Sequence, residues 1–554
     1  MNSVWWMMKN NRRSMIFAMM LCLLWCLFPS IGLSDSVKKP TDKQADRVFL
    51  VHADELKFDQ FGPIPDAQIV KGRVQFQHKG ATLWCDSAYF YQQSNSVKAF
   101  GHVRYVQGKG LSMTAERAAY DGMRQLLQAR KNVVLRHGRQ TLYTDSLDYD
   151  RFNEYAYFFE GGRLVDGKDR LVSDWGDYNT KTREATFWYN VKMHNGKSIV
   201  TTDELHYDTK TSLAHVVGPS KIVQEGSVVT TQDGYFNNKT DHTELFGRST
   251  VSDKEKDITG DSLYYNKKTG LARGLGNVVY VDKRHKNQLL AHRLSYNEKT
   301  GYGFATGRAL AKDYSQGDTL YLHADSMKVY TFHLNTDSVY REVHCFRHVK
   351  AYRSDVQAIC DSLVMNSKDS CMTMYRDPIV WNANRQILGE VIKVYFQDST
   401  IREAQVIHQA LSVEQIPDKQ HFNQLSSRQI NTYFVEGKVR RMVAFGNVKT
   451  IFYPIDEKDS TLQGHLYMET DTLKMFLSAD RKLEKMWTPK NTGVMYPMTQ
   501  IPPTKLKLPE FAWFEQLRPT DPQDVFVWRG KAADAVLKAI PRRAAPLQQF
   551  KDTP

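Results

Sequence analysis

Cysteine is scarce in this chain. Six of the 554 residues are cysteine, and two of these lie in an apolar run near the N-terminus. The four that remain are too few for a disulfide scaffold in a body of this length. We expect Cys85 and Cys360 to be unpaired small core residues, and a bridge among Cys345, Cys360 and Cys371 is the alternative.

Proline is nearly absent from a long central stretch. From residue 66 to 488 the chain has only Pro219, Pro378, Pro417 and Pro454, whereas ten prolines lie between Pro489 and the end. Central β-strands exclude proline because it has no N–H for the ladder. We therefore expect the strand-forming body to end near residue 487 and a Pro-rich, extended tail to occupy 488–554, with one short helix at 531–540.

Motifs of catalytic and metal sites are also missing. The chain has no His-Glu-x-x-His, no Gly-x-Ser-x-Gly, no Cys-x-x-Cys and no complete phosphate loop ending in Gly-Lys-Ser/Thr. The glycine-rich stretch 301–307 lacks βαβ surroundings, so we interpret it as a turn. We expect a protein that is not an enzyme and that holds no cofactor or metal.

The N-terminus has the pattern of a secretory signal peptide. Lys9, Arg12 and Arg13 precede the apolar run 15–28, and small residues follow. An uncleaved membrane anchor is the alternative, although the run is short for a spanning helix, which needs about 20 residues. We assign residues 1–32 to the signal peptide and 33–46 to a linker. Removing 1–32, with three basic and no acidic residues, lowers the formal net charge from +14 to +11. A basic exported chain suits anionic partners, such as a phosphorylated glycolipid or a membrane surface.

What the chain has in abundance is one short phrase, Ala/Thr/Cys/Gly-Asp-Ser-Leu-x-Tyr-Asn/Asp, seen most clearly at 260–266. Five consecutive steps between copies, from Glu116 to Asp261, are 29 residues each. A fixed period of this size is typical of stacked structural units. Aligned on the Asp position, the copies have Asp54, Asp86, Glu116, Asp145, Asp174, Asp203, Gln232, Asp261, His292, Asp325, Asp361 and Glu390.

A second phrase, Gly-Asn-Val, alternates with the first, for example at 276–278 and 446–448. Turn residues separate the two phrases, and Val, Ile, Tyr, Phe and Thr dominate the segments between turns. Helical periodicity is absent. The sequence therefore predicts an all-β fold, an elongated twisted β-jelly-roll or solenoid of tandem antiparallel hairpins. The regular body covers 47–397, and a looser continuation covers 398–487.

The alternation of apolar residues changes phase at the Asp. Before Asp145, Leu142 and Thr144 stand three and one places earlier; after it, Leu147 and Tyr149 stand two and four places later. A flat strand keeps one face at even spacing, so a bulge or sharp bend must turn the strand at this point. Each strand then contributes to two facing sheets around one interior. That interior is either an open apolar groove or the packed core of a β-sandwich.

The recurring carboxylates raise the question of a calcium site. The position is Gln232 in one copy and His292 in another, and the dense Gly-Asp pattern of calcium-binding β-rolls is missing. We expect a structural role at the bend, where a carboxylate accepts hydrogen bonds from nearby backbone amides.

The combination of signal peptide, Ala-Asp-Ser phrases such as 324–326 and Gly-Asn-Val phrases such as 276–278 resembles the OstA-like, or organic-solvent-tolerance, family over residues 47–476. That family includes the periplasmic bridge protein of lipopolysaccharide transport. The resemblance implies a twisted jelly-roll whose apolar groove shields lipid A acyl chains, a periplasmic location with association at the outer membrane, and partners among the transport components of both membranes. Open sheet edges at the two ends would permit head-to-tail pairing with such partners or with a second copy.

The resemblance and the strand pattern together give candidate groove-lining side chains, for each of which core packing is the alternative. They are Leu83, Leu111, Met113, Leu142, Leu147, Tyr149, Leu205, Tyr207, Leu263, Tyr265, Leu289, Leu294, Tyr296 and Leu322. A non-enzymatic carrier or bridge for lipopolysaccharide is the leading hypothesis. Three alternatives remain: a structural or adhesive envelope protein with a closed core, an outer-membrane β-barrel, and a polysaccharide-processing enzyme. We expect no binding of nucleic acid.

Overall fold

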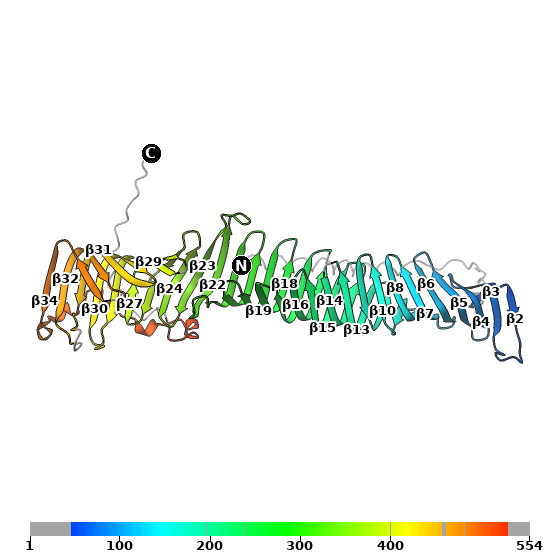
Figure 1. Ribbon diagram of the computed structural model, residues 1–554. Helices are drawn as coiled ribbons and strands as arrows, with labels where there is room; N and C mark the ends of the chain where they lie inside the picture. Colours follow the sequence, from blue (N-terminus) through cyan, green and yellow to red (C-terminus); the bar gives the residue numbers. More distant parts are fainter. Residues whose placement is uncertain are drawn as a thin grey trace, which may run out of the picture.

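The computed structural model describes residues 46–529 apart from 197, 238, 399, 457–460 and 481. The expected signal peptide, nearly all of the linker and the short helix at 531–540 lie outside the described residues. The described chain forms one long body, with its first strands at one end and its last strands at the other (Figure 1). No helix within the described ranges is long and apolar enough to cross a membrane.

The body consists of β-strands joined by short turns. In its N-terminal half the strands are β1 (Phe49–His52), β2 (Glu55–Lys57), β3 (Gln68–His78), β4 (Ala81–Tyr91), β5 (Ser96–Gln107), β6 (Leu111–Asp121), β7 (Leu126–His137), β8 (Gln140–Asp150), β9 (Tyr155–Phe158), β10 (Gly162–Asp166), β11 (Asp169–Ser173), β12 (Trp175–Asn179), β13 (Glu184–Asn195), β14 (Ser198–Asp208), β15 (Leu213–Gln224), β16 (Ser227–Asn237) and β17 (His242–Ser252).

The remaining strands are β18 (Lys256–Asn266), β19 (Leu271–Asp282), β20 (Asn287–Asn297), β21 (Tyr302–Asp313), β22 (Leu320–Phe332), β23 (Tyr340–Tyr352), β24 (Val356–Asn366), β25 (Cys371–Tyr375), β26 (Ile379–Asn382), β27 (Arg385–Leu388), β28 (Val391–Gln397), β29 (Thr400–Gln415), β30 (Phe422–Val435), β31 (Lys438–Phe452), β32 (His465–Leu477), β33 (Leu483–Trp487) and β34 (Asn491–Tyr496). Four 3-10 helices follow, η1 (Met498–Gln500), η2 (Pro503–Lys505), η3 (Glu515–Leu517) and η4 (Asp524–Phe526).

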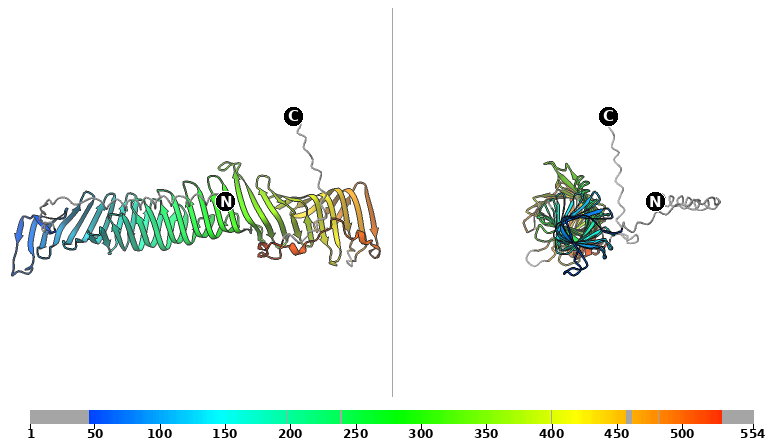
Figure 2. Two further views of the ribbon diagram at one scale, coloured as in Figure 1. Left: turned by 180° about the vertical axis from the view of Figure 1, so that it is seen from behind. Right: turned by 90° about the vertical axis from the view of Figure 1, so that its right-hand side faces the viewer.

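Neighbouring strands pair antiparallel, and the pairing shifts register near the middle of each long strand. In the pair β14–β15, Thr201 lies opposite Lys221 and Glu204 lies opposite Val217, so the register changes between them. The shift divides each strand into two halves that belong to two facing sheets. Seen along the long axis, these sheets form a narrow, twisted body (Figure 2). The predicted all-β architecture of bent antiparallel hairpins is confirmed.

The bend itself is made by two consecutive residues with left-handed backbone in the Gly-Asn phrase. Gly276 has φ 72° and Asn277 has φ 45°; in another repeat, Tyr189 and Asn190 have φ 64° and 52°. Left-handed backbone is ordinary for glycine and tolerated by asparagine. The second phrase therefore supplies the turn that the phase change at the Asp requires.

The carboxylate of the first phrase holds the bend of a neighbouring strand. The Asn277 side-chain amide donates to Asp261 Oδ2 at 3.1 Å, and Asn190 donates to Asp174 Oδ2 at 2.6 Å. The backbone N–H of Asn132 donates to Asp145 Oδ1 at 3.1 Å. The expected structural role of the carboxylate at the bend is confirmed in these repeats. Its pairing with an Asn side chain sixteen residues later was not predicted.

Replacing glycine by alanine at two positions is expected to distinguish the cost of left-handed backbone from the cost of a steric clash. A Cβ at Gly276 would collide with the Asp261 carboxylate, whereas a Cβ at Gly80, also left-handed with φ 76°, would meet nothing within 4 Å. We expect Gly80→Ala to lower the free energy of unfolding by about 1 kcal/mol and Gly276→Ala by about 2 kcal/mol. Hydrogen exchange of the strand amides that flank each glycine measures the difference, because a long repeat body does not unfold as one cooperative unit. Equal losses would show that the Asp–Asn bend imposes no steric limit.

The interior between the two sheets holds two separate apolar cores. One contains buried residues from Val48 to Ile222, and the other contains buried residues from Ala291 to Leu473. Cys85 belongs to the first and Cys360 to the second, and both are free thiols, as expected. Cys345 and Cys371 are free as well, so the alternative disulfide is not formed. Burial raises the pKa of Cys85 to about 12.

Residues 498–529 return along the outer face of the strands between β22 and β32; we name them the C-terminal strap. In Figure 1 the strap is coloured red and lies beside strands coloured green to yellow. Buried polar side chains of the body hold it: Gln386 donates to Ala512 O at 2.9 Å and accepts from Phe514 N at 2.7 Å. We expected an extended tail after residue 487, but the strands run to Tyr496 and the strap is docked. The division of the chain at 397 and 487 stays a prediction.

Candidate functional site

The space between the two halves of the bent strands is the candidate site. Because each strand bends near its middle, the bends form the closed edge of a V, and the turns at the strand ends form its two lips. In β14, Val200, Thr202, Leu205 and Tyr207 are buried and point inward, whereas Asp203 is exposed. The side chains three places before and four places after the Asp position lie nearer to the lips. We call these two places the reporter positions, because the exposure of their side chains shows whether the V is open.

In the N-terminal part of the body the V is packed shut. Leu142 is 5% exposed and Tyr149 is 1% exposed. The space left among Leu142, Phe158 and Phe187 is about 10 Å³, at most enough for one water molecule. We call residues 48–222 the closed section.

Polar contacts near the lips also join the two sheets of the closed section. His78 Nδ1 lies 2.7 Å from the Tyr120 hydroxyl, and His137 Nδ1 lies 2.9 Å from the Tyr178 hydroxyl. Burial lowers the pKa of both histidines, which favours their neutral form. Neutral imidazoles can accept from or donate to these hydroxyls without burying a charge. These pairs fix the width of the closed section.

The V opens between the copies at Asp203 and Gln232. In the copy at Asp203 the two reporter positions, Val200 and Tyr207, are 6% and 3% exposed. In the next four copies both reporter positions are only half-buried, although the residues nearest the bend stay buried. The half-buried side chains are Val229, Phe236, Ile258, Tyr265, Leu289, Tyr296, Leu322 and Val329. We call residues 227–330 the open section and its half-buried inner walls the candidate groove.

The fourteen predicted lining residues divide between the two environments. All lie on inner faces of the bent sheets, but ten are buried: Leu83, Leu111, Met113, Leu142, Leu147, Tyr149, Leu205, Tyr207, Leu263 and Leu294. Tyr265, Leu289, Tyr296 and Leu322 are half-buried along the groove. Eight of the buried ten belong to the closed section, and Leu263 and Leu294 lie beside the bend of the open section. The half-buried residues Val229, Phe236, Ile258 and Val329 were missed, although the spacing from the Asp position identifies them.

The groove walls are apolar up to the lips. Burial raises the pKa of Tyr280, on β19, to about 12, and burial also raises the pKa of Tyr265, followed by the nearby Glu298 carboxylate. The Tyr265 hydroxyl donates to Glu298 Oε2 at 3.1 Å. Both tyrosines therefore stay neutral, and the Tyr265 hydroxyl is held at the rim by Glu298.

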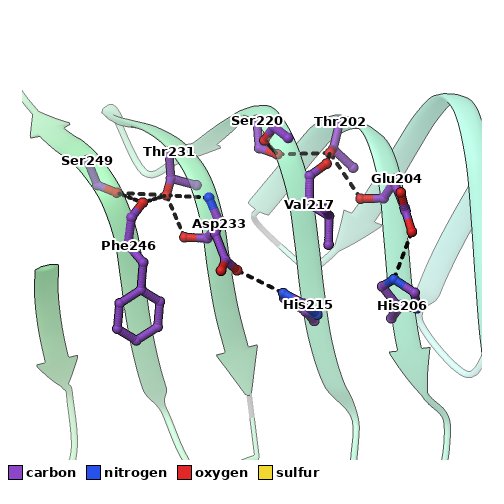
Figure 3. Close-up of polar contacts among 11 residues, drawn as sticks. Thr202, Glu204, His206, His215, Val217, Ser220, Thr231, Asp233, Phe246 and Ser249 are labelled. Atoms are coloured by element: carbon purple, nitrogen blue, oxygen red, sulfur yellow. Dashed lines mark hydrogen bonds and ion pairs between the residues drawn. The ribbon is translucent and has the colours of Figure 1, made fainter. Parts of the chain in front are cut away.

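Two pairs of hydrogen-bonded hydroxyls lie at the bend where the V begins to open (Figure 3). Ser220 Oγ donates to Thr202 Oγ1 at 2.8 Å, and Thr231 Oγ1 and Ser249 Oγ lie 2.7 Å apart. Thr231 Oγ1 also donates to the carbonyl of Asp233 at 2.7 Å. The Thr231 hydroxyl thus bonds both a backbone carbonyl and a neighbouring hydroxyl beside the register shift.

The inner surface of the open section has the composition of an apolar binding surface. Its walls are aliphatic and aromatic, and its acidic and basic groups lie at the rim. Within the described ranges no group of three or more His, Cys, Asp or Glu residues is arranged to hold a metal ion. The fold defines an elongated protein of bent antiparallel strands, with a row of half-buried apolar side chains along the inner faces of the open section.

Comparison with known proteins supports the resemblance found in the sequence. Residues 45–203 and 189–261 match the family described as OstA-like protein, so this similarity covers the closed section and the start of the open section. No curated protein matches the chain.

Among solved structures, the chain is similar to LptH from Pseudomonas aeruginosa, described as the LptA homologous periplasmic component of the conserved lipopolysaccharide transport device. The identity is 14%, the alignment covers 20% of this chain and 82% of LptH, and the TM-score is 0.18.

Proposed function

We propose that this protein is a non-enzymatic, periplasmic carrier or bridge for lipopolysaccharide that shields acyl chains in the groove of the open section. The observation that carries the proposal is the double row of half-buried apolar side chains from Val229 to Val329. An acyl chain in water costs about 0.8 kcal/mol per exposed methylene, so a carrier needs a continuous apolar wall. The similarity to OstA-like proteins agrees with this role.

Both ends of the body offer edges for partners. At the N-terminal end β1 and β2 expose Phe49 and Leu56, at 44% and 55%; at the C-terminal end β33 exposes Trp487 at 45%. Exposed apolar edge strands can pair with another chain by strand addition. We infer that the transport components of the inner and outer membranes, or a second copy of this chain, dock at these edges.

A structural or adhesive envelope protein is the second candidate. The closed section favours it, because its interior is filled by the protein's own side chains. On that hypothesis the half-buried rows of the open section would bind nothing. The two candidates therefore differ in one property, the occupancy of the groove in cells.

Photo-crosslinking from adjacent tyrosine positions tests the proposal. Tyr265 points into the groove, whereas Tyr264, one residue earlier, contacts Phe246 on the outer face with ring centroids 5.9 Å apart. Tyr149 occupies the position of Tyr265 in the closed section. With a photoreactive residue at each position in cells, we expect capture of lipopolysaccharide at 265 and none at 264 or 149. Equal capture at 264 and 265, or none at either, would contradict the groove.

A further inference from the structure

One lip of the groove carries a regular row of lysines. Lys181, Lys210, Lys239, Lys268 and Lys299 each stand seven residues after the Asp position of their repeat, in five consecutive copies. In the three copies before them the position is Gln93, Met123 and Phe152. The row therefore begins in the closed section, with Lys181 and Lys210, and continues along the open section to Lys299; the last open copy has Phe332 at this position.

The lysines are connected through the turns. Lys239 Nζ donates to Lys210 O at 3.1 Å, Lys268 Nζ donates to Lys239 O at 2.8 Å, and Lys299 Nζ donates to Lys268 O. All five side chains are exposed. An ammonium group has three donors, so donors remain on Lys239, Lys268 and Lys299 after their bonds to the preceding turns. The row is thus held in place with binding capacity left over.

The position of the row relates it to the groove. Lys239, Lys268 and Lys299 each follow, by three residues, the half-buried ring of Phe236, Tyr265 or Tyr296. Successive lysines are two strands apart, or about 10 Å, which is close to the screening length of about 8 Å at physiological ionic strength. The four turns 209–212, 238–241, 267–270 and 298–301 contain five lysines and two acidic residues, so this lip is positive beside an apolar wall.

The opposite lip has no net positive charge, because its turns 225–226, 253–255, 283–286 and 314–319 contain four basic and four acidic residues. Its turns include Lys283, which lies 2.6 Å from Asp257, and Arg284, which lies 3.8 Å from Glu255. A bound anion would therefore find its partners chiefly on the lip that carries the lysine row.

We propose that Lys210, Lys239, Lys268 and Lys299 form a phosphate-binding lip, which holds the phosphorylated headgroup of an amphiphile whose chains lie in the adjacent groove. The inference rests on the proposed function and adds the chemical class of the headgroup. Phosphate oxygens accept charge-assisted hydrogen bonds from ammonium groups, and a row of sites one repeat apart lets a headgroup pass from one lysine to the next. The same row without an apolar wall would bind free anions only.

Binding of simple probes to the full mature chain, residues 33–554, tests the lip. Dodecyl phosphate and dodecyl glucoside share one chain and differ in headgroup; inorganic phosphate has the headgroup alone. The lip variant carries Lys210→Gln, Lys239→Gln, Lys268→Gln and Lys299→Gln. A control variant removes the same charge from exposed lysines on outer strand faces, as Lys71→Gln, Lys98→Gln, Lys192→Gln and Lys221→Gln. Affinities are measured by calorimetry below the micelle concentration.

We expect the wild type and the control variant to bind dodecyl phosphate about tenfold more tightly than dodecyl glucoside, the effect of a few exposed charge contacts. The lip variant should lose this preference and keep the glucoside affinity. An unchanged preference in the lip variant, an equal loss in the control variant, or binding of inorganic phosphate as tight as that of dodecyl phosphate would overturn the lip. If neither amphiphile binds, the proposed acyl-chain groove is wrong, and the proposed phosphate-binding lip is wrong with it.

Discussion

Leu142→Ala is expected to lower the free energy of unfolding by about 3 kcal/mol, whereas Leu289→Ala, at the same position of another repeat, should cost about 1 kcal/mol. Both leucines stand three places before the Asp position of their copy. Leu142 is 5% exposed and belongs to the closed section; Leu289 is half-buried on the groove wall. Truncation of the first removes packing contacts and leaves a cavity, but truncation of the second removes surface that already contacts solvent.

Hydrogen exchange gives the appropriate measurement, because long repeat bodies do not unfold as one cooperative unit. Amide protection in β8 should fall strongly in Leu142→Ala, and protection in β20 should fall slightly in Leu289→Ala. Tyr149→Ala and Tyr296→Ala form a second pair with the same contrast. Equal losses at Leu142 and Leu289 would show that the open section is packed like the closed one, and the groove would then have no room for a chain.

Asp524→Ala is expected to release the C-terminal strap from the body with a loss of about 3–5 kcal/mol in docking free energy. Lys350, on β23, is 1% exposed, and its ammonium donates to Asp524 O at 2.9 Å and to Val527 O at 2.7 Å. The Asp524 carboxylate lies 3.8 Å from it and also binds Arg529 at 2.6 Å. Burial lowers the pKa of Lys350, and Asp524 opposes this. Without the carboxylate, the strap would cover an uncompensated charge.

Limited proteolysis within 498–529 reports strap release. The pair Lys449–Glu510 also joins body and strap, at 3.2 Å, but the Lys449 side chain is 30% exposed. Glu510→Ala is the matched control and should cost at most about 1 kcal/mol, since exposed pairs contribute little. The double variant Lys350→Met with Asp524→Ala should recover protection, because it removes the buried charge. Cleavage of Asp524→Ala at the wild-type rate would show that apolar contacts such as Leu517 hold the strap alone.

The bend and the inward-facing residues could be predicted because both follow from the spacing of apolar residues within a single strand. The phase change at Asp145 placed Leu142 and Tyr149 on the same side of a bent strand, and both point inward. The partner of the Asp was not predicted, because Asn190 and Asp174 are sixteen residues apart and come together only through strand pairing. Even so, the recurrence of Asn at this distance from the Asp is a signal that the sequence contains.

The strap could not be predicted from the same reasoning. Lys350, Gln386 and Trp381 stand at outward positions of their strands, where polar and apolar residues both occur in other repeats. Their burial arises from residues more than a hundred positions later in the chain, which carry no repeat. Proline indicated where the strands end but not where the following residues go, because backbone without a ladder can still dock through side-chain amides.

The sequence by itself determined the strand bend, the residues that face the interior and the lysine at the seventh place after the Asp. It did not determine which part of the interior is open. Leu142 and Leu289 are the same residue at the same repeat position, and so are Tyr149 and Tyr265, yet one of each pair is buried and the other is half-buried. Their exposure depends on the angle between the two sheets. That angle is set by contacts across the V, such as His78 with Tyr120, and only the tertiary structure brings such pairs together.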